Sequence, residues 1–542
     1  MVGMVYRGVR KVEPDLIVIG GGSAGCAVAG RLAEAGKRVV LLEAGKDARD
    51  IRSRVPALMG KLVQNPEFDW CYFGEPDPSV GGRPGPWPAG KRLGGGSTIN
   101  GMMFIRGHAW DYDRWAELGA KGWDHASCLP YFRRLEDNER GEDTWRGTGG
   151  PIAVSECRSR YPITDKWIDA ASEAGIRRAK DLNGELAEGV DYIQLSQRRG
   201  WRSSSASYLD GLGNGLKPDV VTEAQVLSIE VADGRARGVT YQRGGQLHSL
   251  RAREGVVLSA GALNTPRLLM LSGIGPAQHL RDMGIDVLRD LPGVGSNLQD
   301  HAGLHLINTV DMHTLNNDAH GLRAPLQLLR FIFGGTGALT TGIGHAQAFV
   351  RSRPGLPVPN LQLAFSAFSF EVTPQGNVVL KPESSVATFI GLMRPAHRGR
   401  VSLRSGDPAA APVIEHQLLG DDDDVEQLVE GIALARRIMR QRSMESHVLH
   451  EVRPGADFES KEALRDYVRL ASMSMFHPVG TAKIGPDGDP DAVLDADLRV
   501  RGVSGLWVAD ASVMPTIPQG NTNATSIMIG DKAADHILRT VA

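Results

Sequence analysis

The sequence predicts a mixed α/β (α+β) fold with two domains, one of them assembled from separate stretches of the chain. The apolar run at 15–20 has the length of a strand and ends at a glycine-rich turn followed by a helix. Between 306 and 464 the pattern changes to mixed strands and one long amphipathic helix. At 505–512 a buried strand and a turn return, followed by another helix, so we expect the chain to re-enter the first domain.

Size and composition are those of an ordinary globular protein. A chain of 542 residues is too long for one small core, so two or more domains are expected. With 42% hydrophobic residues, 23% charged residues and a formal net charge of -2, the chain gives no reason to expect nucleic acid, an anionic membrane surface or a strongly charged partner. The 66 glycines cluster at turns, which predicts backbone that passes close to a phosphate or a ring.

The first elements form a predicted βαβ unit. The strand DLIVIG at 15–20 leads into the small-residue helix AGCAVAGRLAEAG at 24–36, which Gly36 closes as a C-cap. The run RVVLLE at 38–43 is a second buried strand that ends on Glu43. Such a unit is Rossmann-like, with its ligand edge at the ends of the strands.

The turn after the first strand has the spacing GxGxxG. Its first glycine permits the tight turn, the second lets backbone approach a pyrophosphate, and the third lets helix and strand pack closely. Glu43 lies where an acid accepts hydrogen bonds from ribose hydroxyls and disfavours a 2′-phosphate, so NADP is not expected. The pattern predicts an adenine dinucleotide but does not separate FAD from NAD. The predicted contacts are Gly20, Gly22, Ser23, Ala24, Gly25, Glu43 and Ala44.

The intervening chain contains further predicted elements. Residues 45–110 are mostly turns, and their embedded aromatic residues favour an ordered, functional loop over disorder. The stretch 219–242 is typical of a β-hairpin with an Asp-Gly turn, and 254–275 of a strand, a turn and a helix. Strands are also expected at 360–365, 377–382 and 399–405, and an amphipathic helix at 424–439. The four acids at 421–424 fit the start of that helix better than a cation site.

Cysteine usage and the first residues indicate the compartment. Cys26, Cys71, Cys128 and Cys157 lie far apart without a CxxC pair, which favours free buried thiols over disulfide bonds or metal sites. No metal is expected. No apolar run approaches the ~20 residues that span a bilayer, so no integral membrane segment is expected. Residues 1–14 lack a signal-peptide pattern and are interpreted as the short leader of a cytoplasmic protein.

Several further segments identify a family. The segment GKRLGGGSTIN at 90–100 resembles the first signature of the glucose–methanol–choline (GMC) oxidoreductases, and GALNTPRLLMLSGIG at 261–275 resembles the second. The segments GVGSNLQDH at 293–301 and FHPVGT at 476–481 are also similar to family segments. So are DAS at 510–512 and GNTN at 520–523, and the resemblance runs in the family's order from about 15 to 540.

The resemblance implies FAD and a division of the chain into two domains. The FAD-binding domain would comprise 1–155, 200–305 and 465–542, and the substrate-binding domain 156–199 and 306–464, built on an antiparallel sheet backed by helices. Some relatives bind the flavin covalently through a His in the first signature. Ile99 occupies that position here and has no nucleophilic atom, so we expect non-covalent FAD.

The resemblance also implies the residues that contact FAD. The glycines of the first signature would let backbone lie against the flavin, with Ser97 and Asn100 offering hydrogen bonds. Val226 matches a position whose backbone meets the adenine, and Asp510 one near the phosphate and ribitol. The cofactor residues added in this way are Trp70, Arg92, Gly94, Gly95, Ser97, Asn100, Gly101, Met103, Val226, Phe476, Asp510, Ala511, Asn521 and Thr522.

Two residues form the predicted catalytic pair. Oxidation of an alcohol by a flavin requires loss of the hydroxyl proton and transfer of a hydride to the flavin N5, and His477 matches the family's active-site His. Asn521 lies at the second active-site position, where its amide would donate to the developing alkoxide oxygen. His301 is interpreted as structural, whereas His345 and His397 lie in the predicted substrate domain, where they could touch substrate.

The predicted reaction is oxidation of a primary alcohol to an aldehyde, with O2 or a quinone-like or dye-like compound as electron acceptor. The apolar residues Phe476, Met102, Met103, Phe104 and Phe365 favour an aryl or allylic alcohol, whereas no cage for choline and no polar set for a sugar is recognised. The alternatives are a hydroxynitrile lyase that carries FAD without net redox chemistry, a nicotinamide dehydrogenase, and a non-catalytic binding protein.

Overall fold

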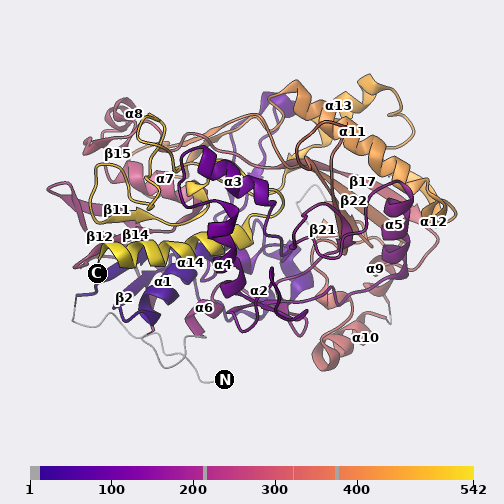
Figure 1. Ribbon diagram of the computed structural model, residues 1–542, viewed down its shortest axis with the longest axis horizontal. Helices are drawn as coiled ribbons and strands as arrows, with labels where there is room; N and C mark the ends of the chain where they lie inside the picture. Colours follow the sequence, from indigo (N-terminus) through magenta and orange to yellow (C-terminus); the bar gives the residue numbers. More distant parts are fainter. Residues whose placement is uncertain (1–12, 211–216, 322, 373–377, 542) are drawn as a thin grey trace.

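The computed structural model describes residues 13–210, 217–321, 323–372 and 378–541. The predicted leader at 1–14 therefore lies almost wholly outside the described residues. Two sheets organise the fold. In Figure 1 a parallel sheet with the helices α1 (Ser23–Glu34) and α14 (Asn523–Thr540) occupies one side, and an antiparallel sheet covered by α11 (Asp422–Met439) occupies the other.

The parallel sheet forms because five short, apolar strands are buried on both faces, as parallel sheets require. Leu16 pairs with both Val39 and Gly255 in the register, which places the first strand at the centre of the sheet. The order is β10 (Asp219–Val221), β2 (Val39–Leu42), β1 (Leu16–Ile19), β14 (Gly255–Leu258) and β27 (Leu506–Val508). The strands come from three distant parts of the chain, so the predicted Rossmann-like, discontinuous sheet is confirmed.

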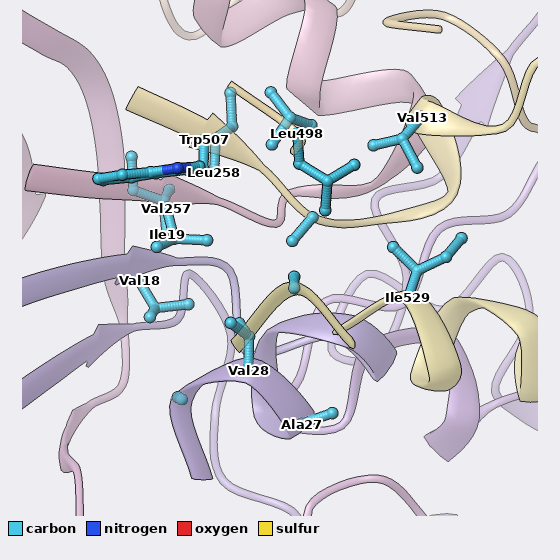
Figure 2. Close-up of a cluster of buried hydrophobic side chains, with 14 of the residues drawn as sticks. Val18, Ile19, Ala27, Val28, Val257, Leu258, Leu498, Trp507, Val513 and Ile529 are labelled. Atoms are coloured by element: carbon cyan, nitrogen blue, oxygen red, sulfur yellow. The ribbon is translucent and has the colours of Figure 1, made fainter. Parts of the chain in front are cut away.

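Two helices close over this sheet. Figure 2 shows side chains of β1, β14 and β27 packed with Ala27 and Val28 of α1 and Ile529 of α14. The helices can approach closely because Gly530 has no side chain. A Cβ at this position would overlap the backbone of Ala24. α1 ends as predicted, with Gly36 at φ +91° directly after the C-cap. The contact between Gly530 and Ala24 places the start of α1 against α14.

A smaller antiparallel sheet adjoins the first. The predicted hairpin is confirmed as β11 (Ala224–Ala232) and β12 (Arg235–Arg243), and β13 (Gln246–Arg251) adds a third strand. Asp233 and Gly234 both have positive φ, the geometry of the two-residue turn that an Asp-Gly pair favours. The strand, turn and helix predicted at 254–275 are β14 and α7 (Gly261–Leu271), and α7 contacts β11.

The second large sheet is antiparallel and backed by helices, as the resemblance implied. α11 and α5 (Pro162–Glu173) cover one of its faces and contribute to its own buried core. Its strand order is β25 (Val448–Arg453), β17 (Ala302–Val310), β22 (Ser385–Leu392), β19 (Leu361–Ser366), β18 (Ala346–Val350) and β7 (Gly189–Tyr192), with β26 (Met473–Ser474) paired to β17.

Details of this region differ from prediction. The strand expected at 377–382 is only β21 (Val378–Val379), paired with β20 (Glu371–Val372) outside the large sheet, and residue 377 is not described. The strand at 399–405 is β23 (Arg400–Ser402), paired with β24 (Val413–Glu415). The helix at 424–439 is confirmed, and Asp421 caps it by accepting a hydrogen bond from the backbone N–H of Asp423.

The loop at 45–110 contains buried aromatic residues and several short helices and strands. These elements are α2 (Ile51–Arg54), η1 (Pro56–Lys61), β3 (Tyr72–Phe73), η2 (Pro78–Val80), β4 (Pro86–Trp87) and η3 (Gly95–Thr98). The four cysteines are free, and all but the half-buried Cys71 are buried. Within the described residues no helix combines the length and the apolar character needed to cross a bilayer.

The remaining helices complete the framework. α3 (Ala109–Glu117) and α4 (His125–Leu135) pack together, and α4 contacts α14. The other described helices are α6 (Ser207–Asp210), α8 (Ala277–Asp282), α9 (Leu315–Asp318), α10 (Arg323–Leu329), α12 (Arg442–Glu445) and α13 (Lys461–Ala471).

Candidate active site

A cavity of about 350 Å³ lies at the carboxyl ends of the parallel strands, where ligands of open α/β sheets bind. Most of the predicted cofactor residues line it: Gly20, Gly22, Ser23, Ala24, Glu43, Ala44, Trp70, Gly95, Asn100, Gly101, Met103, Val226, Phe476, Asp510, Ala511, Asn521 and Thr522. We call the part formed by the GxGxxG turn and Glu43 the nucleotide end, and the part formed by His477 and Asn521 the catalytic end.

The glycine turn at the nucleotide end has the geometry that its spacing predicts. Gly20 adopts φ +93°, which favours glycine. A Cβ at Gly25 would overlap the carbonyl oxygen of Gly20, so the turn closes only with glycine there, and Gly25 itself lies behind the cavity wall. Apart from its chain neighbours, no described residue has an atom closer than 3.9 Å to a Cβ built at Gly22, so this position is left open on the cavity.

Two helices begin at this cavity. Neither α1 nor α14 has a side chain that caps its first N–H groups. Asn523 Nδ2 donates a 2.7 Å hydrogen bond to Ser23 Oγ, which joins the two helix starts. Free N–H groups and the positive ends of two helix dipoles therefore converge, and this combination binds phosphate oxygens.

Glu43 closes the nucleotide end on the other side. Its two carboxylate oxygens accept hydrogen bonds from the backbone N–H groups of Gly21 (2.8 Å) and Gly45 (2.7 Å). Burial raises the pKa of the Glu43 carboxyl above its usual value, and these two donors oppose the shift. The side chain lines the cavity with further lone pairs available to a ligand hydroxyl.

In the first-signature loop, the glycine that is open to the cavity is not one of the two predicted cofactor contacts, Gly94 and Gly95. Gly95 lines the cavity, but a Cβ there would lie 2.6 Å from Gly22 Cα. A Cβ at Gly94 would meet Thr98, and Gly94 does not line the cavity. These two glycines are therefore required by the packing of one loop on the other, whereas Gly96 is the member open to the cavity.

Two other predicted contacts also lie behind the wall. The Ser97 hydroxyl is used inside the protein, because it donates to the Gly94 carbonyl (2.6 Å) and accepts from the Ser205 N–H (3.0 Å). Arg92 is buried with its guanidinium 4.2 Å from the centre of the Phe68 ring. Both side chains support the loop, and neither lines the cavity.

At the catalytic end, the backbone of His477 is held from a distant segment. The His477 N–H donates a 2.8 Å hydrogen bond to Asp300 Oδ1, and Ser474 donates its hydroxyl to the other oxygen of the same carboxyl group. Phe476 adopts φ +65°, a conformation that side chains rarely take and that the surrounding bonds must maintain. This bend presents the His477 ring to the cavity.

The His477 ring contacts a polar side chain at each nitrogen. Its Nδ1 lies 3.0 Å from His301 Nδ1, and its Nε2 lies 3.0 Å from Asn521 Nδ2. Burial lowers the pKa of His477 to about 4, so the imidazole is neutral at pH 7. The interpretation of His301 as merely structural therefore misses its direct contact with the predicted base.

The segment 297–301 also braces the loop that leads to Asn521. Gln299 Nε2 donates to the Pro515 carbonyl (3.1 Å), and Gln299 Oε1 accepts from the Ile517 N–H (3.1 Å). Burial raises the pKa of Asp300 to about 7. The family segment was recognised in the sequence, but nothing in its local pattern indicates which distant loops it joins.

Comparison with known proteins identifies the family. Sequence models described as GMC oxidoreductase match residues 14–303 and 395–530. The chain belongs to the GMC oxidoreductase family. It is therefore an FAD-dependent enzyme that acts on alcohols. The alternative predictions of a nicotinamide dehydrogenase and of a non-catalytic binding protein are wrong.

Among the relatives is an oxygen-dependent choline dehydrogenase of Rhizobium rhizogenes, 39% identical over 531 residues that cover 97% of this chain and 96% of the relative. Solved structures of similar fold include pyridoxine 4-oxidase from Mesorbium loti, with a TM-score of 0.86, 26% identity and coverage of 96% of this chain and 99% of that one. A fungal aryl-alcohol oxidase has a TM-score of 0.84, 25% identity and coverage of 98% and 100%. These GMC relatives do not support the hydroxynitrile lyase.

The cavity of this GMC oxidoreductase fits FAD. A Cβ at Gly22 or Gly96 would enter space that no atom of the described residues fills, and the uncapped starts of α1 and α14 face the same space. Asn521 Oδ1 is buried without a partner among the described residues. Backbone donors, a carboxylate and an unused amide oxygen are the groups that a dinucleotide with a polar ring edge would engage.

Other histidines and aromatic residues named from the sequence lie elsewhere. His345 is fully buried directly before β18 of the antiparallel sheet, where its Nδ1 accepts from the Ala367 N–H, and His397 packs edge-on against His416. Phe365 stacks on Trp167 with ring centres 4.9 Å apart, and Phe104 is core. Neither of these two phenylalanines lines the cavity, so they do not shape a substrate site there.

Sequence reasoning missed several residues of the wall. Met59, Val63, Ile343 and Met475 add apolar surface, and Arg267 adds a cation. They come from a 3-10 helix, three loops and α7, which are far apart in the chain. Isolated apolar residues in such segments carry no periodic pattern, so the sequence contains no signal that separates them from ordinary core.

Proposed function

We propose that this enzyme oxidises a primary alcohol, preferably an apolar aryl or allylic one, to the aldehyde. His477 takes the hydroxyl proton on Nε2, and Asn521 donates its amide N–H to the alcohol oxygen. The observation that carries the proposal is the 3.0 Å contact between His477 Nε2 and Asn521 Nδ2 at the cavity wall. A hydroxyl oxygen on the cavity side of this contact, within hydrogen-bond distance of both atoms, can donate its proton to Nε2 and accept from the amide N–H.

The second ring nitrogen determines whether His477 can act as a base. Its Nε2 carries a lone pair only if the proton sits on Nδ1, and His301 Nδ1, 3.0 Å away, is then the acceptor of that proton's hydrogen bond. His301 must in turn carry its own proton on Nε2. Once His477 has accepted the hydroxyl proton, its Nδ1–H continues to donate to His301, which stabilises the imidazolium as it forms.

FAD would be held by both helix starts, Glu43 and the first-signature loop. When bound, it supplies the acceptor for the hydride that leaves the alcohol carbon. Ile99 is buried, lines the cavity and has no atom that can form a bond to the flavin, which supports dissociable, non-covalent FAD. The final electron acceptor would be O2 or a quinone-like or dye-like compound.

The cavity wall favours an apolar substrate. Met102, Met103, Ile343, Met475 and Phe476 contribute to it. Among the described residues that line the cavity, the only carboxylates are Glu43 and Asp510, and both accept hydrogen bonds from backbone N–H groups at strand ends. A quaternary ammonium binds best in an aromatic cage beside an acid, and this wall offers neither.

Choline remains the second candidate substrate because relatives that cover 97% of the chain are named oxygen-dependent choline dehydrogenase. The test is a panel of benzyl, cinnamyl and aliphatic primary alcohols with choline, each added anaerobically to the purified enzyme. Bleaching of the flavin absorbance by aryl or allylic alcohols, at lower concentrations than choline requires, is the expected result. Bleaching by choline alone would overturn the substrate assignment. Air or a dye then identifies the acceptor, through peroxide formation or dye reduction.

A further inference from the structure

The segment from α10 to η4 (Arg330–Gly334) has its apolar side chains on the outside. α10 buries Gln327, which is 3% exposed, and leaves Leu326, Leu328 and Leu329 about half exposed. An isolated surface helix normally does the reverse, with its leucines inward and its amides in water. Gln327 is held inside because its Oε1 accepts a 3.1 Å hydrogen bond from the Ala338 N–H.

The π-helix η4 continues this surface. Phe331 anchors it, with its ring centre 4.4 Å from that of Trp201, whereas the neighbouring Phe333 is 84% exposed and Ile332 is half exposed. In Figure 1, α10 projects from the body of the molecule at the lower right. A cluster of large, exposed apolar side chains on a projecting element indicates a surface that a membrane or another protein molecule covers. We call Leu326, Leu328, Leu329, Ile332 and Phe333 the apolar face.

Charge distinguishes between the possible occupants. From 319 to 345 the chain contains two arginines, Arg323 and Arg330, and no acidic residue. Both arginines are exposed, and neither forms an ion pair with a described carboxylate. Arg323 Nη1 lies 2.8 Å from His313 Nδ1, and the other nitrogen of that ring contacts the buried Asp318 carboxylate. In a symmetric dimer through this face the four guanidinium groups would gather without an acidic residue from 319–345 to neutralise them. Anionic lipid headgroups would neutralise them while the acyl chains cover the leucines and Phe333.

We propose that the apolar face docks on the surface of an anionic lipid bilayer, with Phe333 and Ile332 inserted at the boundary between headgroups and acyl chains. Arg323 and Arg330 contact the headgroups. The same stretch of chain continues through η5 (Ala338–Thr340), which contacts η1, to Ile343. Because Ile343 and Met59 of η1 line the cavity, the docking surface and part of the cavity wall belong to adjoining segments.

The test uses the full-length, FAD-loaded protein and sedimentation with vesicles. Binding to vesicles of phosphatidylcholine with about one third phosphatidylglycerol is expected, with weaker binding to pure phosphatidylcholine. The double variant Ile332→Ser/Phe333→Ser should bind the anionic vesicles at least about tenfold more weakly, because two inserted apolar side chains are lost. Arg323→Gln/Arg330→Gln should abolish the preference for the anionic vesicles.

A matched control replaces an exposed leucine outside the apolar face. Leu247 on β13 is 67% exposed, and Leu247→Ser should leave vesicle binding unchanged. Flavin content and thermal unfolding show that every variant is folded. The proposal is overturned if the wild type does not bind anionic vesicles or if Leu247→Ser weakens binding equally. It is also overturned if sedimentation equilibrium shows a dimer that the Ile332/Phe333 variant dissociates while vesicles are not bound, because the face would then join two copies.

Discussion

At the nucleotide end of the cavity the chain offers backbone N–H groups from the starts of two helices, whereas at the catalytic end it offers side chains from three distant segments. The nucleotide end depends on the absence of side chains, since Gly25 must lack a Cβ for the turn to close and Gly22 is open to the ligand. The catalytic end depends on His477, His301 and Asn521, whose ring and amide nitrogens meet at 3.0 Å. Added side-chain atoms at Gly25 should therefore disrupt the nucleotide end, whereas loss of a side chain should disrupt the catalytic end.

The largest effect is expected from adding one methyl group at the nucleotide end. Gly25→Ala would force a Cβ into the Gly20 carbonyl and separate α1 from the turn, so FAD binding should be lost and the folded yield should fall steeply. Flavin absorbance of the purified protein measures this. Gly488→Ala is the control, because a Cβ there meets no atom of the described residues within 4 Å, its chain neighbours aside. A yellow Gly25→Ala enzyme with normal FAD content would show that the turn adapts.

Removing a partner at the catalytic end should act on rate and leave FAD bound. His301→Ala deletes the acceptor of the His477 Nδ1–H, and a hydrogen bond to a charged group contributes about 1.5–3 kcal/mol. Flavin reduction by the alcohol should therefore slow about 10- to 100-fold. His301→Asn should recover part of the rate, because its amide oxygen can accept from the same N–H.

Two results would contradict this role for His301. One is an unchanged rate in His301→Ala, and the other is an equal loss in His301→Asn and His301→Ala, which would indicate packing alone. His345→Asn replaces another fully buried histidine that does not line the cavity, and its rate should match the wild type.

The smallest effect is a pH dependence of turnover that arises from His477 at the catalytic end. Burial lowers the pKa of His477 to about 4, so kcat/KM should stay level from about pH 8 to pH 5 and fall as the ring becomes protonated near pH 4. In the unfolded chain the pKa of histidine is about 6.5. At this residue the unfolded state therefore binds more protons, so the contribution of His477 to stability against urea should decrease as pH falls below about 6.5, whereas Asp300, with its pKa raised to about 7, contributes in the opposite direction. Loss of kcat/KM already near pH 6.5 would show that His477 is not desolvated.

The same contrast explains how much the sequence predicted. At the nucleotide end, the strands at 15–20 and 38–43, the glycine turn and Glu43 are local patterns, and the structure has these elements at the cavity. The hairpin at 219–242 and the helix α7 were equally readable, because turn residues and periodicity lie within one short stretch.

Contacts between residues far apart in the chain could not be predicted from the sequence. His301 lies 176 positions from His477, and their contact depends on the positive φ of Phe476, which no residue type in the segment requires. Gly95 and Ser97 were assigned to the cofactor, although packing between two loops determines the positions of both. The outward leucines of α10 follow from a single inward hydrogen bond of Gln327. Such features arise from tertiary packing.

The proposed role of His477 is tested most directly by the rate of flavin reduction in His477→Ala, measured anaerobically by stopped flow with the best alcohol of the panel. We predict a rate about 10²- to 10⁴-fold below the wild type, because general base catalysis is lost, with FAD content unchanged. His397→Ala, a control outside the cavity, should reduce its flavin at the wild-type rate. Reduction of His477→Ala within about twofold of the wild type would contradict the account, since the hydroxyl proton would then leave without this imidazole.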